Sequence, residues 1–424
     1  MLRQTALTCL LTSIVALPLS VQANAEKNQA PSLKAIVGHY ADIAYANYSD
    51  ALQTAQTLQK AINQLTKKPN EETLKQAKQA WLQARIPYQQ TEVFRFGNKI
   101  VDDWEGQVNA WPLDEGLIDY VDSERYEYEL GNSGASANII ANKQIKVGSK
   151  TINATNITPE LLASLNELGG SEANVATGYH AIEFLLWGQD LHGTQAGAGE
   201  RKATDFMPGK QCTNQHCDRR VAYLKAASEL LVNDLTDMVT QWAPKKSDNY
   251  RHELLSDSPK QGLRKMFYGM GSLALGELAG ERMKVALEAN STEDEHDCFS
   301  DNTHNSHYYN AQGIYNIFFG KYQRIDGSTV TGPSVADLVK AKQPKTAQQI
   351  EKLFNTTQSS MQTLIDKAEK GMAFDQMIAA NNKEGHTIIG NAIQSLVAQT
   401  EGIEKAAKVI GINNLNPDNA DHAF

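Results

Sequence analysis

The fold is decided first by residues 72–96, which read ETLKQAKQAWLQARIPYQQTEVFRF. Apolar side chains recur in this stretch at steps of three and four residues, at Leu74, Ala77, Trp81, Ala84 and Tyr88. Because an α-helix has about 3.6 residues per turn, this spacing puts all of them on one helical face. Pro87 is expected to kink the helix rather than end it, since the apolar stripe continues past it.

Helical periodicity extends over most of the chain, at residues 33–65, 217–242, 262–287, 347–372 and 385–409. Strand-like alternation is weak, and only residues 145–157 resemble a short hairpin. The sequence therefore predicts an all-α fold. A polar, glycine-containing stretch at residues 193–215 predicts the boundary between two helical-bundle domains, residues 26–200 and 201–424. The similar layout of the two halves suggests a diverged duplication with a functional cleft between the domains.

The composition is that of a globular, acidic protein. The 424 residues include 40 basic and 49 acidic side chains, which gives a formal net charge of −9. This balance argues against a nucleic-acid partner, because binding to phosphates requires a basic excess. With 41% hydrophobic and 21% charged residues, the chain can form a sizeable core.

The first 25 residues have the layout of a cleavable signal peptide. Arg3 precedes an apolar run at residues 6–21, and Ala23 and Ala25 supply small residues at the cleavage position. Cleavage after Ala25 removes Arg3 and changes the net charge to 39 − 49 = −10. We therefore expect an exported protein.

Export changes the interpretation of the cysteines, because an oxidising compartment allows disulfides to persist. Cys212 and Cys217 lie five residues apart in a polar loop, and we favour a disulfide between them. The rival interpretation is a metal site that includes His216. It lacks the C-x2-C spacing, and no second Cys/His pair follows at zinc-finger distance. Cys298 is left over.

Charged side chains continue two of the apolar stripes. Glu92 follows Tyr88 on the first helical face, and Arg85 lies two turns before Glu92. In the second helix, Glu277 and Glu281 continue an apolar stripe, with Arg282 beside them. A buried carboxylate must be paired, protonated or bound to a cation. These residues therefore predict either a buried Arg/Glu network or a polar site shared by the two halves, and two such helices favour the shared site.

Residues 178–187, GYHAIEFLLW, predict a buried helix that carries two polar side chains. His180 and Glu183 are three residues apart and therefore share a face. This H-x-x-E spacing presents two metal ligands from one helix, and the alternative is a core histidine bonded to its neighbouring glutamate. A polar loop with His296, Asp297, Asp301, His304 and His307 could also hold a metal, although loops collect such residues for turns and caps.

Five segments, taken in order, resemble the imelysin-like family. They are the W-x3-R-x2-Y-x3-E pattern that starts at Trp81, the WPLD loop at residues 111–114, the G-x-H-x-x-E motif that starts at Gly178, GELAGER at residues 276–282 and CFSDNT at residues 298–303. The resemblance covers nearly the whole mature chain. It implies a two-domain, all-helical protein that is periplasmic or associated with the outer membrane, and that functions in iron uptake with an outer-membrane or iron-transport partner.

The resemblance and the buried charges together predict a binding protein. We expect it to hold a divalent or trivalent metal ion, with iron favoured and zinc second, or a small iron-containing ligand. The predicted metal ligands are His180, Glu183, Glu92 and Glu281. The residues expected to orient these ligands or to contact the bound molecule are Arg85, Tyr88, Trp111, Asp114, Glu277, Arg282, Ser300 and Asp301.

The family also carries a metallopeptidase label, so the alternative function is a metal-dependent peptidase that uses the same motif. A zinc hydrolase needs about three protein ligands and an open coordination position. Only His180 and Glu183 are supplied locally. A third alternative is a buried network without any ligand.

Overall fold

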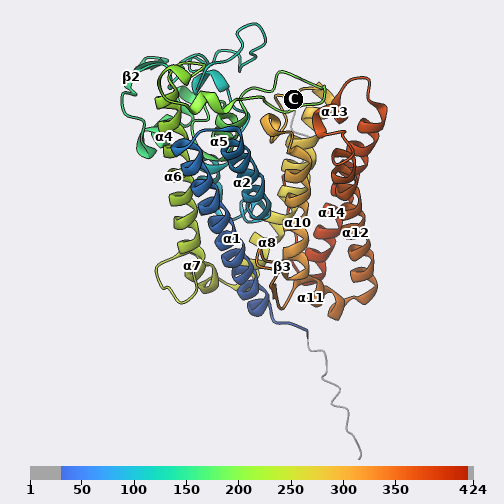
Figure 1. Ribbon diagram of the computed structural model, residues 1–424. Coiled ribbons are helices and arrows are strands. Elements are labelled where there is room, and N and C mark those ends of the chain that lie inside the picture. The colour runs from blue at the N-terminus through green and yellow to red at the C-terminus, as the bar shows by residue number, and fades with distance from the viewer. Residues whose placement is uncertain (1–29, 419–424) are drawn as a thin grey trace, which may run out of the picture.

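A computed structural model describes residues 30–418 (Figure 1). The predicted signal peptide, residues 1–25, lies outside the described residues. Within residues 30–418, no helix combines the length and the apolar character that crossing a membrane requires.

Helices make up most of the described chain, and the predicted all-α fold is confirmed. The α-helices are α1 (Leu33–Lys67), α2 (Glu71–Gln89), α3 (Lys99–Val108), α4 (Pro159–Leu165), α5 (Gly178–Trp187), α6 (Cys217–Trp242), α7 (Tyr250–Ser256), α8 (Pro259–Ser272), α9 (Ala286–Ala289), α10 (Thr303–Phe319), α11 (Val335–Lys342), α12 (Pro344–Ala368), α13 (Phe374–Ile378) and α14 (Lys383–Ile410). A π-helix, η6 (Leu273–Val285), joins α8 to α9.

Two short antiparallel hairpins complete the fold. The first pairs β1 (Gln144–Val147) with β2 (Lys150–Asn153), so that Ile145 faces Ile152. It lies within the predicted hairpin region. The second pairs β3 (Lys321–Gln323) with β4 (Thr329–Thr331).

Helix α1 runs through the whole structure and takes part in two hydrophobic cores. Its 35 residues span about 52 Å, and it packs along α2 and α6 (Figure 1). Its first half, from Ile36 to Tyr48, belongs to a core shared with α8, η6, α10, α12 and α14. Its second half, from Ala51 to Leu65, belongs to a core shared with α2, α5 and α6.

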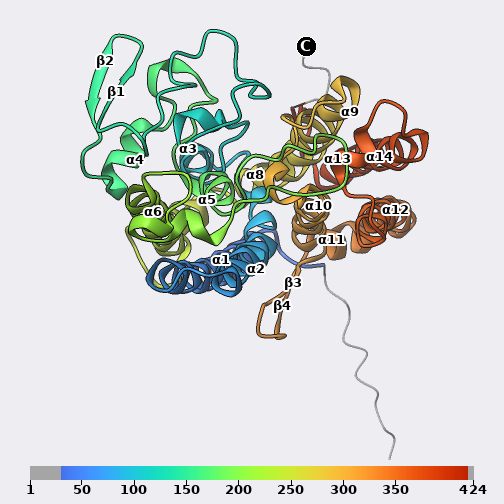
Figure 2. The same cartoon turned by 45° about the horizontal axis from the view of Figure 1, so that its top comes forward.

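The C-terminal helices form a layer beside this group. Helix α12 packs against α10 and α14, and α14 packs against η6. Helix α10 also packs against α2, so that it joins the two layers (Figure 2). The division predicted at residues 200/201 stays a prediction. Helix α6, which follows that position, packs on α1 and α5 and shares their core.

Helix α2 ends earlier than the sequence predicts. A capping box between Asn70 and Thr73 starts it, as the side chain of each accepts a hydrogen bond from the backbone N–H of the other. Pro87 lies inside its last turn. The helix ends at Gln89, where the backbone N–H and the hydroxyl of Thr91 both donate to the Tyr88 carbonyl. Pro87 does not end the helix, as predicted, but the expected continuation to residue 96 was wrong. Glu92 lies in a separate 3-10 turn, η1 (Glu92–Phe94).

The segment predicted as one α-helix at residues 262–287 changes its winding midway. After Ser272 the backbone bonds run from residue i to i+5 over the whole of η6, whereas an α-helix uses i to i+4. Positions that share a face in an α-helix therefore separate in η6.

Candidate functional site

The G-x-H-x-x-E motif opens helix α5, all ten residues of which are buried. Gly178 has a φ of +75°, and a Cβ atom there would lie 2.3 Å from the carbonyl oxygen of Val108. Only glycine fits this position. The glycine thereby allows α5 to approach the end of α3 closely, which fixes where His180 lies.

Glu183 holds His180 and is itself held by the loop before α10. Its Oε2 lies 3.0 Å from Nδ1 of His180. Its Oε1 accepts hydrogen bonds from the backbone N–H of Ser300 at 3.0 Å and from the Ser300 hydroxyl at 2.6 Å. Glu183 therefore orients the imidazole, as carboxylates do for metal-binding histidines.

His180, His296 and Asp297 form a group in which one ligand atom of each lies within 4.8 Å of the others. Their exposed fractions are 2%, 1% and 0%. The two imidazole rings meet edge to face with centroids 4.9 Å apart, and Trp111 packs against the other side of His296 at 5.2 Å. Nε2 of His180 is buried without a hydrogen-bond partner among the described residues.

Arg85 on α2 supplies the countercharge of this group. Its Nη2 lies 2.6 Å from Oδ1 of Asp297, and its Nη1 donates to Asn109 Oδ1 at 2.6 Å. The guanidinium also lies 5.7 Å from the ring centroid of Tyr88 and 5.0 Å from that of Tyr179. Arg85 is therefore held by Asp297, by Asn109 and by two tyrosine rings.

The surroundings set the protonation of the group. Burial, followed by the nearby charge of Arg85, lowers the pKa of His180 to about 3. Burial and the charge of Arg282 hold the pKa of His296 well below its usual value. Burial alone would raise the pKa of Asp297, but Arg85 and His180 outweigh it and lower this pKa to about 2. At neutral pH the group thus presents two neutral imidazoles and one carboxylate, the forms that bind metals.

A second polar cluster surrounds Arg282 on η6. Its Nη2 lies 2.8 Å from Oε2 of Glu92, its Nε lies 2.9 Å from Oε1 of Glu277, and its Nη1 lies 2.8 Å from Oδ1 of Asn310. Arg95 contacts Glu277 from the other side at 3.4 Å. Glu92 and Glu277 are thus paired in an Arg/Glu network, the first of the two alternatives that the sequence left open for these residues.

Amide side chains connect the two clusters. The side chain of Asn109 contacts Arg85, Glu105 and Nε2 of His296. That of Gln89 accepts from Asn310 at 2.8 Å and lies 3.4 Å from Nδ1 of His296. The two clusters therefore form one buried polar layer between α2, α3 and α5 on one side and η6, the loop before α10, and α10 on the other.

Of the twelve site residues predicted from the sequence, nine lie in the two clusters and three lie elsewhere. Six lie at or directly beside the His180 group, namely His180, Glu183, Arg85, Tyr88, Trp111 and Ser300. Three form the network around Arg282, namely Glu92, Glu277 and Arg282 itself. Glu281 lines a cleft beside Glu277 and is not part of the converging group. Asp114 accepts hydrogen bonds from Glu129 and Asn132, so it holds a loop elsewhere. Asp301 lies in the loop before α10, outside both clusters.

His296 and Asp297 are the site residues that the predicted ligand set omits. They belong to the polar loop that the sequence singled out as able to hold a metal, and they directly precede the CFSDNT segment. Separately, Cys212 and Cys217 are joined by a disulfide, and Cys298 is a free thiol.

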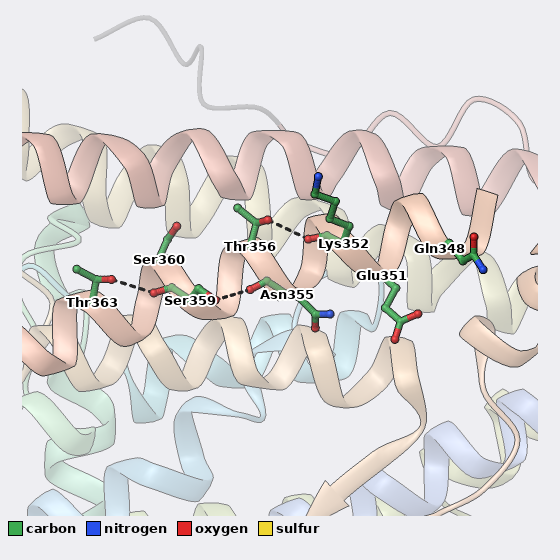
Figure 3. A pocket seen from close by; sticks show the side chains of 8 residues that line it. All are labelled: Gln348, Glu351, Lys352, Asn355, Thr356, Ser359, Ser360 and Thr363. Carbon is green, nitrogen blue, oxygen red and sulfur yellow. Dashed lines mark hydrogen bonds between the residues drawn. The ribbon is translucent and has the colours of Figure 1, made fainter. Parts of the chain in front are cut away.

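Two clefts on the surface differ sharply in chemistry. The first, of about 530 Å³, follows one face of α12 (Figure 3). Three of its hydroxyls, those of Thr356, Ser359 and Thr363, donate to backbone carbonyls of the helix itself, as Ser359 does to that of Asn355 at 2.9 Å, so these three do not converge on a ligand. The second, of about 560 Å³, reaches Asn109 and Trp111 beside the His180 group and is lined by Asp102, Asp103, Glu105, Glu167, Glu172, Glu277, Glu281 and Asp294, with Arg95 among them.

The fold and the buried group define an all-helical protein whose polar centre lies where its helical layers meet. The chain belongs to the imelysin family, whose sequence model matches residues 44–403.

Relatives of this family extend over most of the chain. Iron-regulated protein A of Synechococcus elongatus is 23% identical over 351 residues, which cover 80% of this chain and 77% of that protein. A crystal structure described as an iron-regulated protein A precursor of Parabacteroides distasonis has a TM-score of 0.63 at 17% identity, and it covers 90% of this chain and 97% of that one. An imelysin-like protein of Psychrobacter arcticum has a TM-score of 0.59 at 14% identity with the same coverage.

Proposed function

We propose that this protein binds a metal ion, with iron favoured, at the group formed by His180, His296 and Asp297, and that it serves iron uptake. The observation that carries the proposal is the convergence of these three buried ligand atoms within 4.8 Å. Glu183 and Arg85 then position the ligands rather than bind the ion. This revises the ligand set expected from the sequence, in which Glu183, Glu92 and Glu281 bind the ion directly.

The donor set fits the proposed ion. Two imidazoles and one carboxylate form the ligand combination of many non-haem Fe(II) centres, and imidazole with carboxylate also suits zinc. The buried Nε2 of His180 has no hydrogen-bond partner among residues 30–418, which leaves a donor atom for an ion. The relatives described as iron-regulated protein A support iron over zinc.

The burial of the group favours an ion over a polypeptide substrate. None of the three side chains is more than 2% exposed, so a peptide bond cannot reach them without a large rearrangement. Both oxygens of Glu183 are occupied by His180 and Ser300, so it is not free to act as a base toward water. A metal-dependent peptidase therefore remains the less favoured function.

The role in uptake extends the proposal beyond the ion itself. If the signal peptide is cleaved, the protein works in the periplasm or at the outer membrane, where it would pass iron to a transport partner. We favour the bare ion over an iron-containing ligand, because none of the three side chains is more than 2% exposed.

Metal binding is tested on protein purified without chelator and without oxygen. We expect the wild type to bind about one equivalent of Fe(II), and His296→Gln to bind at least ~10-fold more weakly. His39→Gln is the matched control, because His39 is also buried but bonds to the Gly320 carbonyl far from the group. Equal iron content in all three proteins would contradict the proposal.

The peptidase alternative needs a separate assay. Cleavage of an unfolded protein that is abolished both by chelator and by His296→Gln, but retained in His39→Gln, would establish the peptidase and replace the binding proposal.

A further inference from the structure

The acidic cleft, which is the cleft of about 560 Å³ lined by Asn109 and Trp111, reaches the His180 group. Both of these side chains also contact His296. The amide nitrogen of Asn109 lies 3.4 Å from Nε2 of His296, and the Trp111 ring packs edge to face on the imidazole with centroids 5.2 Å apart. The buried group is therefore only one side chain away from the acidic cleft.

Asn109 connects a carboxylate of this cleft to the group. Asn109 is 1% exposed, and its amide nitrogen also lies 3.2 Å from Oε1 of Glu105, which lines the acidic cleft. Its amide oxygen accepts a hydrogen bond from Arg85 at 2.6 Å. Asn109 thus lies between Glu105 and His296, so an ion that enters from this cleft meets the amide of Asn109 before it meets His296.

The acidic cleft carries a large excess of negative charge. Eight carboxylates and one guanidinium, that of Arg95, line it, so its formal charge is 1 − 8 = −7. Burial raises the pKa of Glu105 to about 7 in spite of the nearby charge of Arg95, so this carboxyl is partly protonated at neutral pH. The rim carboxylates, Glu167 and Glu172, are exposed and form no ion pair with a lysine or arginine among residues 30–418. A cleft lined by one sign of charge focuses the field and raises the local concentration of counterions.

Another cleft reaches the same group but lacks this charge. It has a volume of about 240 Å³, and Arg85, Gln89 and Ser306 line it. The hydroxyl of Ser306 donates to Asp297, and the side chain of Gln89 lies 3.4 Å from Nδ1 of His296. Five amide side chains line this amide cleft, and Arg85 is the one charged residue in its lining. The amide cleft therefore offers a cation no countercharge.

We propose that metal ions reach the His180 group through the acidic cleft, past Asn109, and that the rim carboxylates draw them in. This inference rests on the proposed metal binding at His180, His296 and Asp297. None of these three side chains is more than 2% exposed, so an ion needs a route from the surface. Of the two clefts, the acidic one attracts cations and the amide cleft does not.

The test is stopped-flow mixing of metal-free, full-length protein with Fe(II) in the absence of oxygen, followed by quenching of tryptophan fluorescence. Trp111 reports the ion because its ring contacts His296. In about 10 mM salt, Glu167→Gln/Glu172→Gln should slow association about tenfold, the effect expected when two unit charges about 10 Å from a divalent ion in water are removed. In about 1 M salt, where the Debye length is about 3 Å, the variant and the wild type should associate at equal rates.

Two control pairs separate the field of the cleft from the net charge of the protein. Glu229→Gln/Glu369→Gln removes the same two charges from exposed positions on α6 and at the end of α12, outside the acidic cleft. Gln79→Glu/Gln83→Glu adds two charges at exposed positions of the amide cleft. Each pair should change the association rate less than about 3-fold, because screening weakens charges that lie away from the path of the ion. All six side chains are exposed, and circular dichroism checks that each variant folds as the wild type does.

The outcomes separate the route from the site. The route is overturned, with metal binding intact, if Glu167→Gln/Glu172→Gln associates as fast as the wild type in low salt or no more slowly than Glu229→Gln/Glu369→Gln. It is also overturned if Gln79→Glu/Gln83→Glu speeds association about tenfold, which would assign entry to the amide cleft. A wild type that binds no Fe(II), or that binds it no better than His296→Gln, would overturn the proposed function and the route with it.

Discussion

Replacement of Arg85 by methionine tests whether Arg85 neutralises the charge of Asp297 in the His180 group. Arg85 is 1% exposed and Asp297 is fully buried, and their closest atoms are 2.6 Å apart. Arg85→Met keeps an unbranched side chain of comparable length but leaves the Asp297 carboxylate without its countercharge. Removal of one partner of a buried pair costs about 3–5 kcal/mol of unfolding free energy.

A bound metal should restore part of the lost unfolding free energy. At a free metal concentration of 100 times Kd, the wild type gains about 2.7 kcal/mol. In Arg85→Met, Asp297 no longer shares its charge with a guanidinium. If its affinity for the ion rises about tenfold, the gain at the same metal concentration is about 4.1 kcal/mol.

The assay is urea unfolding followed by circular dichroism, with chelator and with Fe(II) under anaerobic conditions. Arg220→Met is the matched control, because Arg220 is also fully buried and binds Asp119 through two nitrogens, at 2.6 and 2.9 Å. It should lose less stability, because Asp119 keeps its ion pair with Arg201 at 2.8 Å, and it should gain no more from iron than the wild type. The reasoning is refuted if Arg85→Met loses less than about 1 kcal/mol, or if iron stabilises both variants equally.

Three further predictions concern single positions. Gly178→Ala should lower the free energy of unfolding, measured in urea, by at least ~2 kcal/mol, because a Cβ would meet a backbone carbonyl. Gly131→Ala should lower it less, because the space around Gly131 is open. Burial and then a neighbouring carboxylate raise the pKa of Asp234 from 3.8 to about 7. Between pH 4 and 7 the folded wild type therefore binds one more proton than the unfolded chain, and its stability falls as pH rises through that window. Asp234→Asn should be about 1 kcal/mol more stable than wild type at pH 8 and equal to it at pH 4. A difference in thermal unfolding that does not change with pH would contradict this. Ser300→Ala removes one hydrogen bond to Glu183 and should weaken iron binding by about 10-fold or more in a direct titration, with unfolding changed by only about 1 kcal/mol.

The periodic parts of the chain could be predicted from sequence. Helix α6 has the predicted bounds, and α1 and α14 match within two residues, because their apolar stripes are long and regular. The end of α2 could not be predicted from the stripe alone. Its termination depends on Thr91, whose backbone N–H and hydroxyl both bond to Tyr88.

The π-helix explains why the second stripe was misjudged. Glu277 and Glu281 share a face only if the winding is α-helical. In η6 the residue on the same line as Glu277 is instead Arg282, five positions on, and the two bond at 2.9 Å. The i to i+5 pattern leaves no clear periodic signal, so the sequence placed Glu281 on one face with Glu277. The ligand role of Glu281 stays a prediction.

The ligands from the loop before α10 depended on tertiary contacts. The sequence paired His180 with Glu183 through helical spacing, which is local, and the structure brings them to 3.0 Å. His296 and Asp297 reach the same place through tertiary contacts, because α10 packs against α2 and Ser300 in the loop before α10 bonds to Glu183. No spacing rule connects them to α5.

Helix α1 has a consequence for how the protein unfolds. The first half of α1 lies in one core and its second half lies in the other. Unfolding of either core therefore disrupts α1, which also removes part of the other core. The two cores should therefore lose structure together, in one cooperative transition. An ion held between the helical layers would then shift that single transition as a whole, and a local measurement at Trp111 would report the same midpoint as the global loss of helix.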